Sequence, residues 1–291
     1  MREEPWHLGA AAGRPGEPSS GPARPIVMKE LTMALILTLA LGACGSPGSP
    51  VDDDIDVPEG RGGVILEIRD EGGFIPVEVS LTRVPRFVVF EDGTVVSHQV
   101  EAGAVDGRAA PLFENDLSEA DFADLLTFVQ DLALGDVERV DINEATNVAD
   151  APTTVLTYFD ETGPHRLAVY ALGFDTPRDP RAAILASMVD LLETATTPPG
   201  EPYAPPSFEV LANSEMVNPQ LPVEETWPLE MTPGEMDDLG FNGWRCVVVD
   251  AEEIDPSLPI ERNGVAASVW TFDGTPHTLL TRPLFPHEEG C

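Results

Sequence analysis

The amino-acid sequence predicts an α+β fold, in which antiparallel β-hairpins combine with two amphipathic helices and a smaller β-rich unit follows. Three observations predict it: short runs of strand-forming residues between glycine-containing turns, two segments with apolar residues at helical spacing, and a hydrophobic content of 42%, which is enough for a packed core. A β-rich block, a helix, a hairpin and a second helix follow one another within residues 62–196, which is the order of one α+β unit.

The first β-rich block is predicted to be a β-meander. Asp92-Gly93 lies between two strand-like runs, and an Asp-Gly pair in that position is a strong hairpin signal. Gly72-Gly73 indicates an earlier turn. The predicted strands cover residues 64–68, 77–81, 87–90 and 94–97.

Two amphipathic helices follow, with a hairpin between them. Ser118 is the predicted N-cap of the first, with the acidic Asp121 three residues later. The apolar residues of this helix are Phe122, Leu125, Leu126, Val129, Leu132 and Ala133. Asp179-Pro180 caps the second helix. Its apolar face consists of Ile184, Leu185, Met188, Leu191 and Leu192. The hairpin pairs residues 155–159 with 166–172 around Glu161-Thr162-Gly163.

A proline-rich linker over residues 197–206 is predicted to separate this unit from a β-rich C-terminal unit, residues 207–291. Asp273-Gly274 provides a hairpin turn there, and Thr232-Pro233-Gly234-Glu235 has the form of a capping box that opens a short helical turn. A helix is also expected over residues 251–263, interrupted by its two prolines. The predicted strands cover residues 208–211, 246–249, 267–272 and 278–284.

The N-terminal region has the order of a bacterial export signal. Residues 31–41 form an apolar run of the length of a signal-peptide core, too short to span a bilayer as a helix. Leu41-Gly42-Ala43-Cys44 follows at once and resembles a lipobox. The resemblance implies cleavage of residues 1–43 and lipidation of Cys44. A start at Met28 gives the better leader, so residues 1–27 are interpreted as an over-extended gene start.

Residues 44–61 are predicted to be the lipidated cysteine and an acidic, flexible tether. Four aspartates crowd residues 52–56 without the spacing of an EF-hand calcium loop, which favours a solvated linker over a calcium site. The predicted location is the extracytoplasmic face of the cell membrane, with the lipid on Cys44 as the contact to that membrane.

Five segments of the mature chain are similar to those of a known family. They are Val84-Pro85-Arg86-Phe87-Val88-Val89-Phe90, Asp150-Ala151-Pro152-Thr153-Thr154, Trp227-Pro228-Leu229, Arg245-Cys246 and Arg282-Pro283-Leu284-Phe285-Pro286. The family is that of actinobacterial lipoproteins without an assigned function. The resemblance runs from about Cys44 to the C-terminus. It implies a source and an exported topology, and it carries no activity.

The formal net charge of −35 restricts the partners of the chain. A polyanion repels nucleic acid, and the sequence shows no basic patch that would neutralise phosphates. We therefore expect no nucleic-acid binding. An envelope protein or a small solute remains as the expected partner, and the sequence leaves the oligomeric state open.

Two cysteines remain after Cys44, namely Cys246 and Cys291, in a compartment where thiols oxidise. A disulfide between them is predicted. A metal site would need two more ligands, and neither cysteine has the close C-x2-C partner that is usual in zinc sites. No metal and no cofactor is therefore expected.

The sequence contains no recognisable catalytic frame, such as G-x-S-x-G or S-x-x-K for a hydrolase. His165 and His277 are expected to be exposed at hairpin turns, and His287 to lie at a mobile terminus. Trp227, Trp244 and Trp270 are expected in the core, with an aromatic ligand platform as the alternative. The preferred hypothesis is a non-catalytic binding module. The alternatives are an envelope enzyme with an unrecognised carboxylate or histidine site, or a structural envelope protein.

Overall fold

The structure is a computed structural model that describes residues 60, 62–75, 77–98, 111–134, 139–143, 148–217, 223–224, 227–253 and 266–291. The predicted leader and Cys44 lie outside these residues, and so does most of the tether and of the helix expected at 251–263. Among the described helices, none combines the length and the apolar character that crossing a membrane requires.

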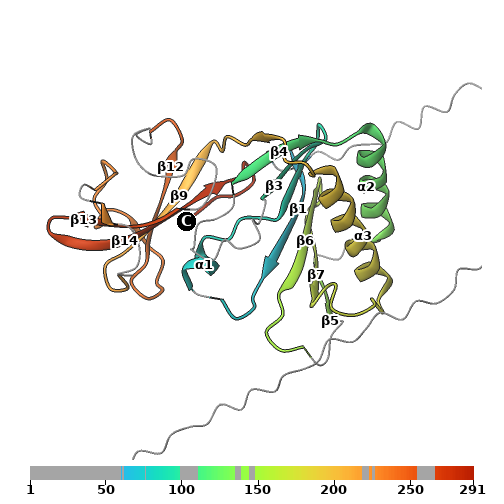
Figure 1. Ribbon diagram of the computed structural model, residues 1–291, viewed down its shortest axis with the longest axis horizontal. Helices are drawn as coiled ribbons and strands as arrows, with labels where there is room; N and C mark the ends of the chain where they lie inside the picture. Colours follow the sequence, from blue (N-terminus) through green and yellow to red (C-terminus); the bar gives the residue numbers. More distant parts are fainter. Residues whose placement is uncertain are drawn as a thin grey trace, which may run out of the picture. The chain divides into compact units, whose positions relative to one another are not determined.

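The fold is α+β, as predicted, and its larger sheet has eight strands (Figure 1). The strand order is β5-β7-β6-β1-β2-β3-β4-β8, in which β5 and β7 pair in parallel and the other neighbours are antiparallel. The strands are β1 (Val64–Glu71), β2 (Phe87–Phe90), β3 (Thr94–His98), β4 (Leu112–Asp116), β5 (Arg139–Asn143), β6 (Thr153–Asp160), β7 (Gly163–Tyr170) and β8 (Glu201–Pro202).

Strands β1 to β4 are neighbours in chain order, so this region is a meander. Three of its four predicted strands are confirmed as β1, β2 and β3, while β4 was not predicted. The turn between β2 and β3 is the predicted Asp92-Gly93 pair. The Gly93 amide donates to the Phe90 carbonyl at 3.0 Å, and Gly93 has a φ of 87°, which glycine adopts without strain. The second predicted hairpin is also confirmed, because β6 and β7 pair around Glu161 and Thr162.

The prediction of a strand at residues 77–81 is wrong, because this segment forms the short helix α1 (Val77–Leu81). Its apolar and polar residues alternate as in a strand, but both edges of β1 are already paired, with β2 and with β6. The segment therefore connects β1 to β2 as a helical turn. It places Leu81 against a buried cluster of Leu211, Trp244, Cys246 and Leu280.

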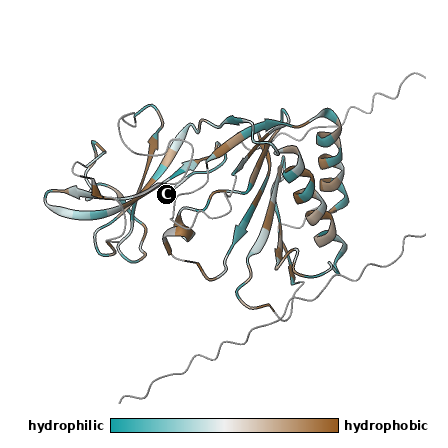
Figure 2. Ribbon diagram, viewed as in Figure 1, coloured by the Kyte–Doolittle hydropathy of each residue, from teal (hydrophilic) through white to brown (hydrophobic). Residues whose placement is uncertain are grey.

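Both predicted long helices are confirmed as α2 (Glu119–Asp131) and α3 (Pro180–Ala195). The Ser118 hydroxyl accepts the Asp121 amide at 3.1 Å, and the Asp179 carboxylate accepts the Arg181 amide at 2.9 Å. Both helices bury their apolar residues, Leu125 and Leu185 among them, in one cluster with side chains of β1, β2, β3, β6 and β7. Figure 2 shows each helix divided between hydrophobic and hydrophilic residues.

The second sheet has six strands in the order β10-β13-β14-β9-β12-β11. Five of them are antiparallel, and the two-residue β10 pairs in parallel with β13. The strands are β9 (Ser207–Asn213), β10 (Val223–Glu224), β11 (Asp237–Asp238), β12 (Arg245–Asp250), β13 (Ala266–Phe272) and β14 (Thr275–Leu284). The β13–β14 hairpin turns at Asp273-Gly274, as predicted.

Two local predictions in this region have different outcomes. At the capping box of residues 232–235, the Glu235 carboxylate accepts both the amide and the hydroxyl of Thr232 at 2.8 Å, and the segment forms a turn that no helix follows. Trp244 and Trp270 are buried, which confirms the core interpretation for these two tryptophans. In the predicted linker, β8 pairs with β4 and Tyr203 is buried. The division of the mature chain into two units stays a prediction.

Candidate functional site

The most unusual feature of the described chain is a buried network of charged side chains. It joins residues from β1, β9, β14 and the C-terminal segment that follows β14. Its members are Glu67, Arg69, Glu209, Arg282, His287 and Glu288. Charged groups are seldom removed from water unless they are paired, so their arrangement decides what this site can do.

Glu67 is the centre of one half of the network. It is only 3% exposed, and its carboxylate accepts His287 Nε2 at 2.7 Å and Arg69 Nε and Nη2 at 2.5 and 2.6 Å. Burial raises the pKa of Glu67, but the hydrogen bonds from His287 and Arg69 outweigh burial and lower this pKa to about 2. Glu67 is therefore a carboxylate at neutral pH, and a poor general acid.

Arg282 is the centre of the other half. It binds Glu209 through Nε and Glu288 through Nη1 at 3.0 Å. Glu288 also accepts the Phe285 amide at 3.1 Å and reaches Arg69 Nη2 at 3.4 Å. The two halves thus meet at Glu288. The three carboxylates are balanced by two guanidinium groups and by His287 when its imidazole is protonated.

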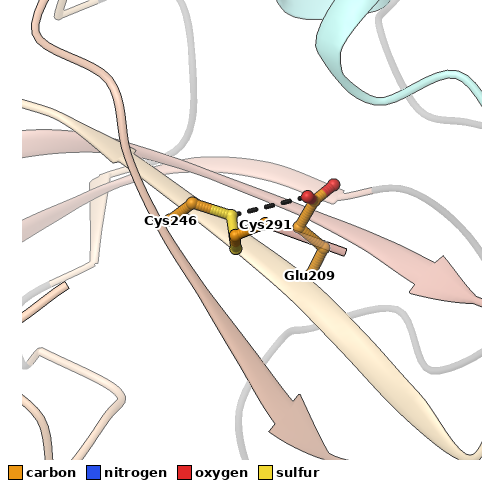
Figure 3. Close-up of side chains that lie close together, drawn as sticks. All are labelled: Glu209, Cys246 and Cys291. Carbon is orange, nitrogen blue, oxygen red and sulfur yellow. Dashed lines mark hydrogen bonds between the residues drawn. A yellow bond between two sulfur atoms is a disulfide. The ribbon is translucent and has the colours of Figure 1, made fainter. Parts of the chain in front are cut away.

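A disulfide between Cys246 and Cys291 adjoins this network, with a Cα–Cα distance of 5.9 Å. Figure 3 shows Glu209 beside it, with Oε1 at 3.4 Å from Cys246 Sγ. A disulfide sulfur carries no proton, so this approach is a contact without a shared hydrogen. The three residues bring two sulfurs and one carboxylate oxygen within 4.8 Å of one another.

The four histidines that the structure describes do not form one site, because each has different partners. His98 Nδ1 donates to the Pro85 carbonyl at 3.1 Å, and burial lowers the pKa of His98. His277 packs edge-on against Trp227, and burial lowers its pKa as well.

The expected exposure of His165 is wrong, His277 is half-buried rather than exposed, and His287 is buried rather than at a mobile terminus. His165 Nε2 lies 3.0 Å from the Asp160 carboxylate, which holds the ring against the β6–β7 turn at 7% exposure. His287 is equally buried because Glu67, 220 residues away in sequence, is its partner. Each expectation was based on neighbours in sequence alone.

A second candidate site lies at one end of the eight-stranded sheet. Glu71, Thr153 and Tyr170 form a row across β1, β6 and β7, and both β1 and β7 run towards this row. The loops that leave it contain Phe74, which is 93% exposed, and Phe174, which is 56% exposed. One strand separates the two loops, so their starting points lie about 10 Å apart. We call residues 72–75 and 171–175 the aromatic loops.

Sequence reasoning did not find the members of the network other than His287, nor the two phenylalanines. The sequence does contain a signal for the network: Glu67 directly follows the apolar run of residues 64–66 in strand VILEIRDE, and Glu209 is the only charged residue of strand SFEVLAN. A charge that is kept inside a buried strand implies a partner. The sequence did not reveal which residues these partners are, because they come from distant segments of the chain.

Comparison of the chain with protein-family models, with curated proteins and with solved structures finds no match. The interpretation of the site therefore depends on its geometry.

Proposed function

We propose that the chain is a lipid-anchored protein of the extracytoplasmic membrane face, which binds a partner through the aromatic loops and catalyses no reaction. The observation that carries the binding part is the exposure of Phe74 and Phe174 on neighbouring loops. Transfer of one phenylalanine side chain out of water is favourable by roughly 1.5–3 kcal/mol. Two such side chains at one end of a sheet offer a partner a larger apolar contact area than a single scattered apolar residue does.

The position of these residues on loops also supports binding. A packed sheet with α2 and α3 against it holds the loop ends at fixed places, and binding residues commonly lie on loops that a rigid scaffold positions. The exposed Asp150 and Asp175 are close in sequence to the row of strand ends and to Phe174. A protein surface or small solute with an apolar centre and a basic rim fits this chemistry best.

The use of the titratable groups supports the non-catalytic part. Glu67, Glu209 and His287 are buried and occupied by ion pairs that hold distant segments together. An open depression on α3 is lined by Asp190, Glu193, Thr194 and Thr197, and no histidine is among these residues. This depression thus offers carboxylates and hydroxyls but neither of the histidine and cysteine side chains that commonly act as base or nucleophile.

Lipid anchoring is supported by the lipobox-like sequence that ends at Cys44 and by the acidic tether after it. Expression of the full chain in a bacterial host should give a protein that partitions into the detergent phase and carries acyl groups on Cys44 in mass spectrometry. The Cys44→Ser variant should stay unprocessed or be released. A native protein with an unmodified Cys44 would contradict the anchor.

Binding is tested by thermal-shift screening of purified residues 45–291 against peptidoglycan fragments, small solutes, basic peptides and envelope extract fractions. A ligand that binds only the folded state raises the apparent Tm. The shift should disappear in the Phe74→Ser/Phe174→Ser variant and persist in Phe241→Ser, a control that removes an exposed phenylalanine of the second sheet. Turnover of a panel substrate that is lost on substitution of one histidine would favour an enzyme. A shift that persists in the double variant would contradict the role of the aromatic loops.

A further inference from the structure

The disulfide and Glu209 form a cluster whose three side chains share one face of the second sheet. Cys246 on β12 pairs with Leu211 on β9, and Glu209 lies two residues away along β9. Residues two apart in a strand project to the same face, so Glu209 is the diagonal neighbour of Cys246. The chain end adds Cys291 to this pair (Figure 3).

The conformation of Gly290 brings Cys291 to this place. Gly290 has a φ of 72°, and a Cβ at this position would lie 2.5 Å from Val248 Cγ2 and 3.0 Å from Leu284 Cδ1. Only glycine fits such a turn without strain. The chain end is therefore shaped to bring its last sulfur back to β12.

The carboxylate of Glu209 is oriented for a ligand on the sulfur side. Its Oε2 is held by Arg282 Nε, while Oε1 points to Cys246 Sγ. A hydrogen bond to one oxygen fixes the direction of the other, which is how neighbouring groups position the ligands of metal sites.

We propose that, when the disulfide is reduced, Cys246, Cys291 and Glu209 bind one thiophilic divalent cation such as Zn²⁺. A dithiol reduces the disulfide by thiol–disulfide exchange, which leaves two protein thiols and the reductant as its own disulfide. A phosphine supplies two electrons and is oxidised to the phosphine oxide, while one water supplies the oxygen of that oxide and the two thiol protons. Binding of the cation then displaces the two thiol protons into solvent and forms two metal–sulfur bonds and one metal–oxygen bond.

The geometry of the cluster suits this ligand set. Zinc–sulfur bonds of about 2.3 Å in a tetrahedral site place two sulfurs roughly 3.8 Å apart. Side-chain rotation supplies this separation, because the two Cα atoms are already 5.9 Å apart. Cys291 is exposed while Cys246 and Glu209 are buried. Water therefore reaches the fourth coordination position from the Cys291 side.

The charges also balance. The two thiolates add two negative charges, which the divalent cation neutralises, while Glu209 keeps its ion pair with Arg282. The cluster thus attaches Cys291 to β12 in two ways, by a disulfide when it is oxidised and by a shared cation when it is reduced.

The test is a Co²⁺ titration of residues 45–291 after anaerobic reduction with a phosphine that is then removed. Binding should give one equivalent of cobalt with a thiolate-to-cobalt charge-transfer band and with visible bands of tetrahedral intensity. The oxidised protein should show neither. Zn²⁺ should displace the cobalt and remove both signals.

Variants separate the three ligands. Cys291→Ser changes an exposed terminal residue and should abolish the charge-transfer band of a two-thiolate site. Glu209→Gln should weaken cobalt binding at least about tenfold. Asp141→Asn, an exposed carboxylate of the first sheet, should leave the titration unchanged.

Three results would overturn the proposal: absence of the charge-transfer band in the reduced protein, an unchanged band in Cys291→Ser, or full affinity in Glu209→Gln. If circular dichroism shows that Glu209→Gln does not fold, the ligand set is determined by X-ray absorption spectroscopy of the wild-type zinc complex. Two sulfur and two oxygen neighbours support the proposal, and any other ligand set contradicts it.

Discussion

The two faces of the eight-stranded sheet are closed in different ways. On one face, α2 and α3 bury a cluster that is entirely apolar, with Leu125, Leu185 and Met188 against the strands. On the other, Val64, Val88 and Phe159 pack against Phe285 of the C-terminal segment, and Glu67 pairs with His287 of the same segment. The first face is closed by helices that lie between strands of the same sheet in sequence, α2 between β4 and β5 and α3 between β7 and β8. The second is closed by Phe285 and His287, which lie more than a hundred positions from the strand residues that they contact.

The difference separates two sources of stability. The apolar face stabilises the fold in proportion to the apolar area that is removed from water, and many side-chain arrangements would bury a similar area. The ionic face gains little net free energy from its pairs, but the loss of one partner leaves the others charged and buried. We therefore expect the two faces to respond differently to substitution and to pH.

The largest effect is expected for Glu67→Leu. It leaves Arg69 and His287 without their carboxylate and should lower the free energy of unfolding by about 3–5 kcal/mol, measured by urea denaturation. Asp141→Asn, which breaks the exposed pair with Arg139, should leave the urea midpoint unchanged. A midpoint in Glu67→Leu equal to that of the wild type would show that the ionic face has no such role.

On the apolar face, Leu185→Ala should lower the free energy of unfolding by about 2–5 kcal/mol, since the side chain is fully buried and the cavity collapses only in part. The matched control is Leu191→Ala on the same helix, where the side chain is half-buried. The free energy of unfolding should fall clearly less in this control. Equal losses would mean that burial on this face does not set the stability.

The two faces should also differ in their response to acid. The pKa of Glu67 is lowered from 4.5 to about 2 in the folded chain, so its contribution is complete above pH 4.5 and is lost as the pH falls towards 2. The shift corresponds to about 3 kcal/mol. Urea denaturation of wild type and Glu67→Gln between pH 6 and pH 2 measures it. The difference in stability between them should shrink by that amount as the pH falls. A constant difference would contradict the lowered pKa.

The smallest effect is expected at the N-terminus of α2. Ser118→Ala removes the side-chain acceptor of the Asp121 amide and should cost about 1 kcal/mol. Ser187→Ala, at an exposed position within α3, should cost less, because it removes only a hydroxyl that donates to the Ala183 carbonyl. A larger loss at Ser187 than at Ser118 would contradict the capping role.

The features that the sequence predicted correctly are those that depend on neighbouring residues, and the features that it missed depend on distant ones. The caps at Ser118 and Asp179 and the Asp-Gly turns are local signals, and the structure confirms each of them. The prediction of a strand at residues 77–81 was wrong. Their alternating pattern fits a strand, but whether a sheet edge is free to accept that strand depends on the whole fold. Strand β5 was missed as well, since its short RVDIN sequence has little apolar content and pairs in parallel with a strand that follows it in sequence.

The candidate site was less predictable than the fold. Cys246 and Cys291 were found by counting cysteines in a chain that is predicted to be exported, and the structure joins them in a disulfide. Glu209 was not found as their neighbour, because the pairing register of β9 with β12 decides that position. His287 was assigned to a mobile terminus, because its partner Glu67 lies in the first strand of the sheet.

A double-mutant cycle between Glu67 and His287 tests most directly the claim that the C-terminal segment closes the sheet through the ionic network. The free energies of unfolding of the wild type, Glu67→Leu, His287→Leu and the double variant would be measured in urea at pH 6. The account predicts a coupling energy of about 1–3 kcal/mol, with the double variant more stable than the sum of the single losses allows. Additive losses, within about 0.5 kcal/mol, would contradict it.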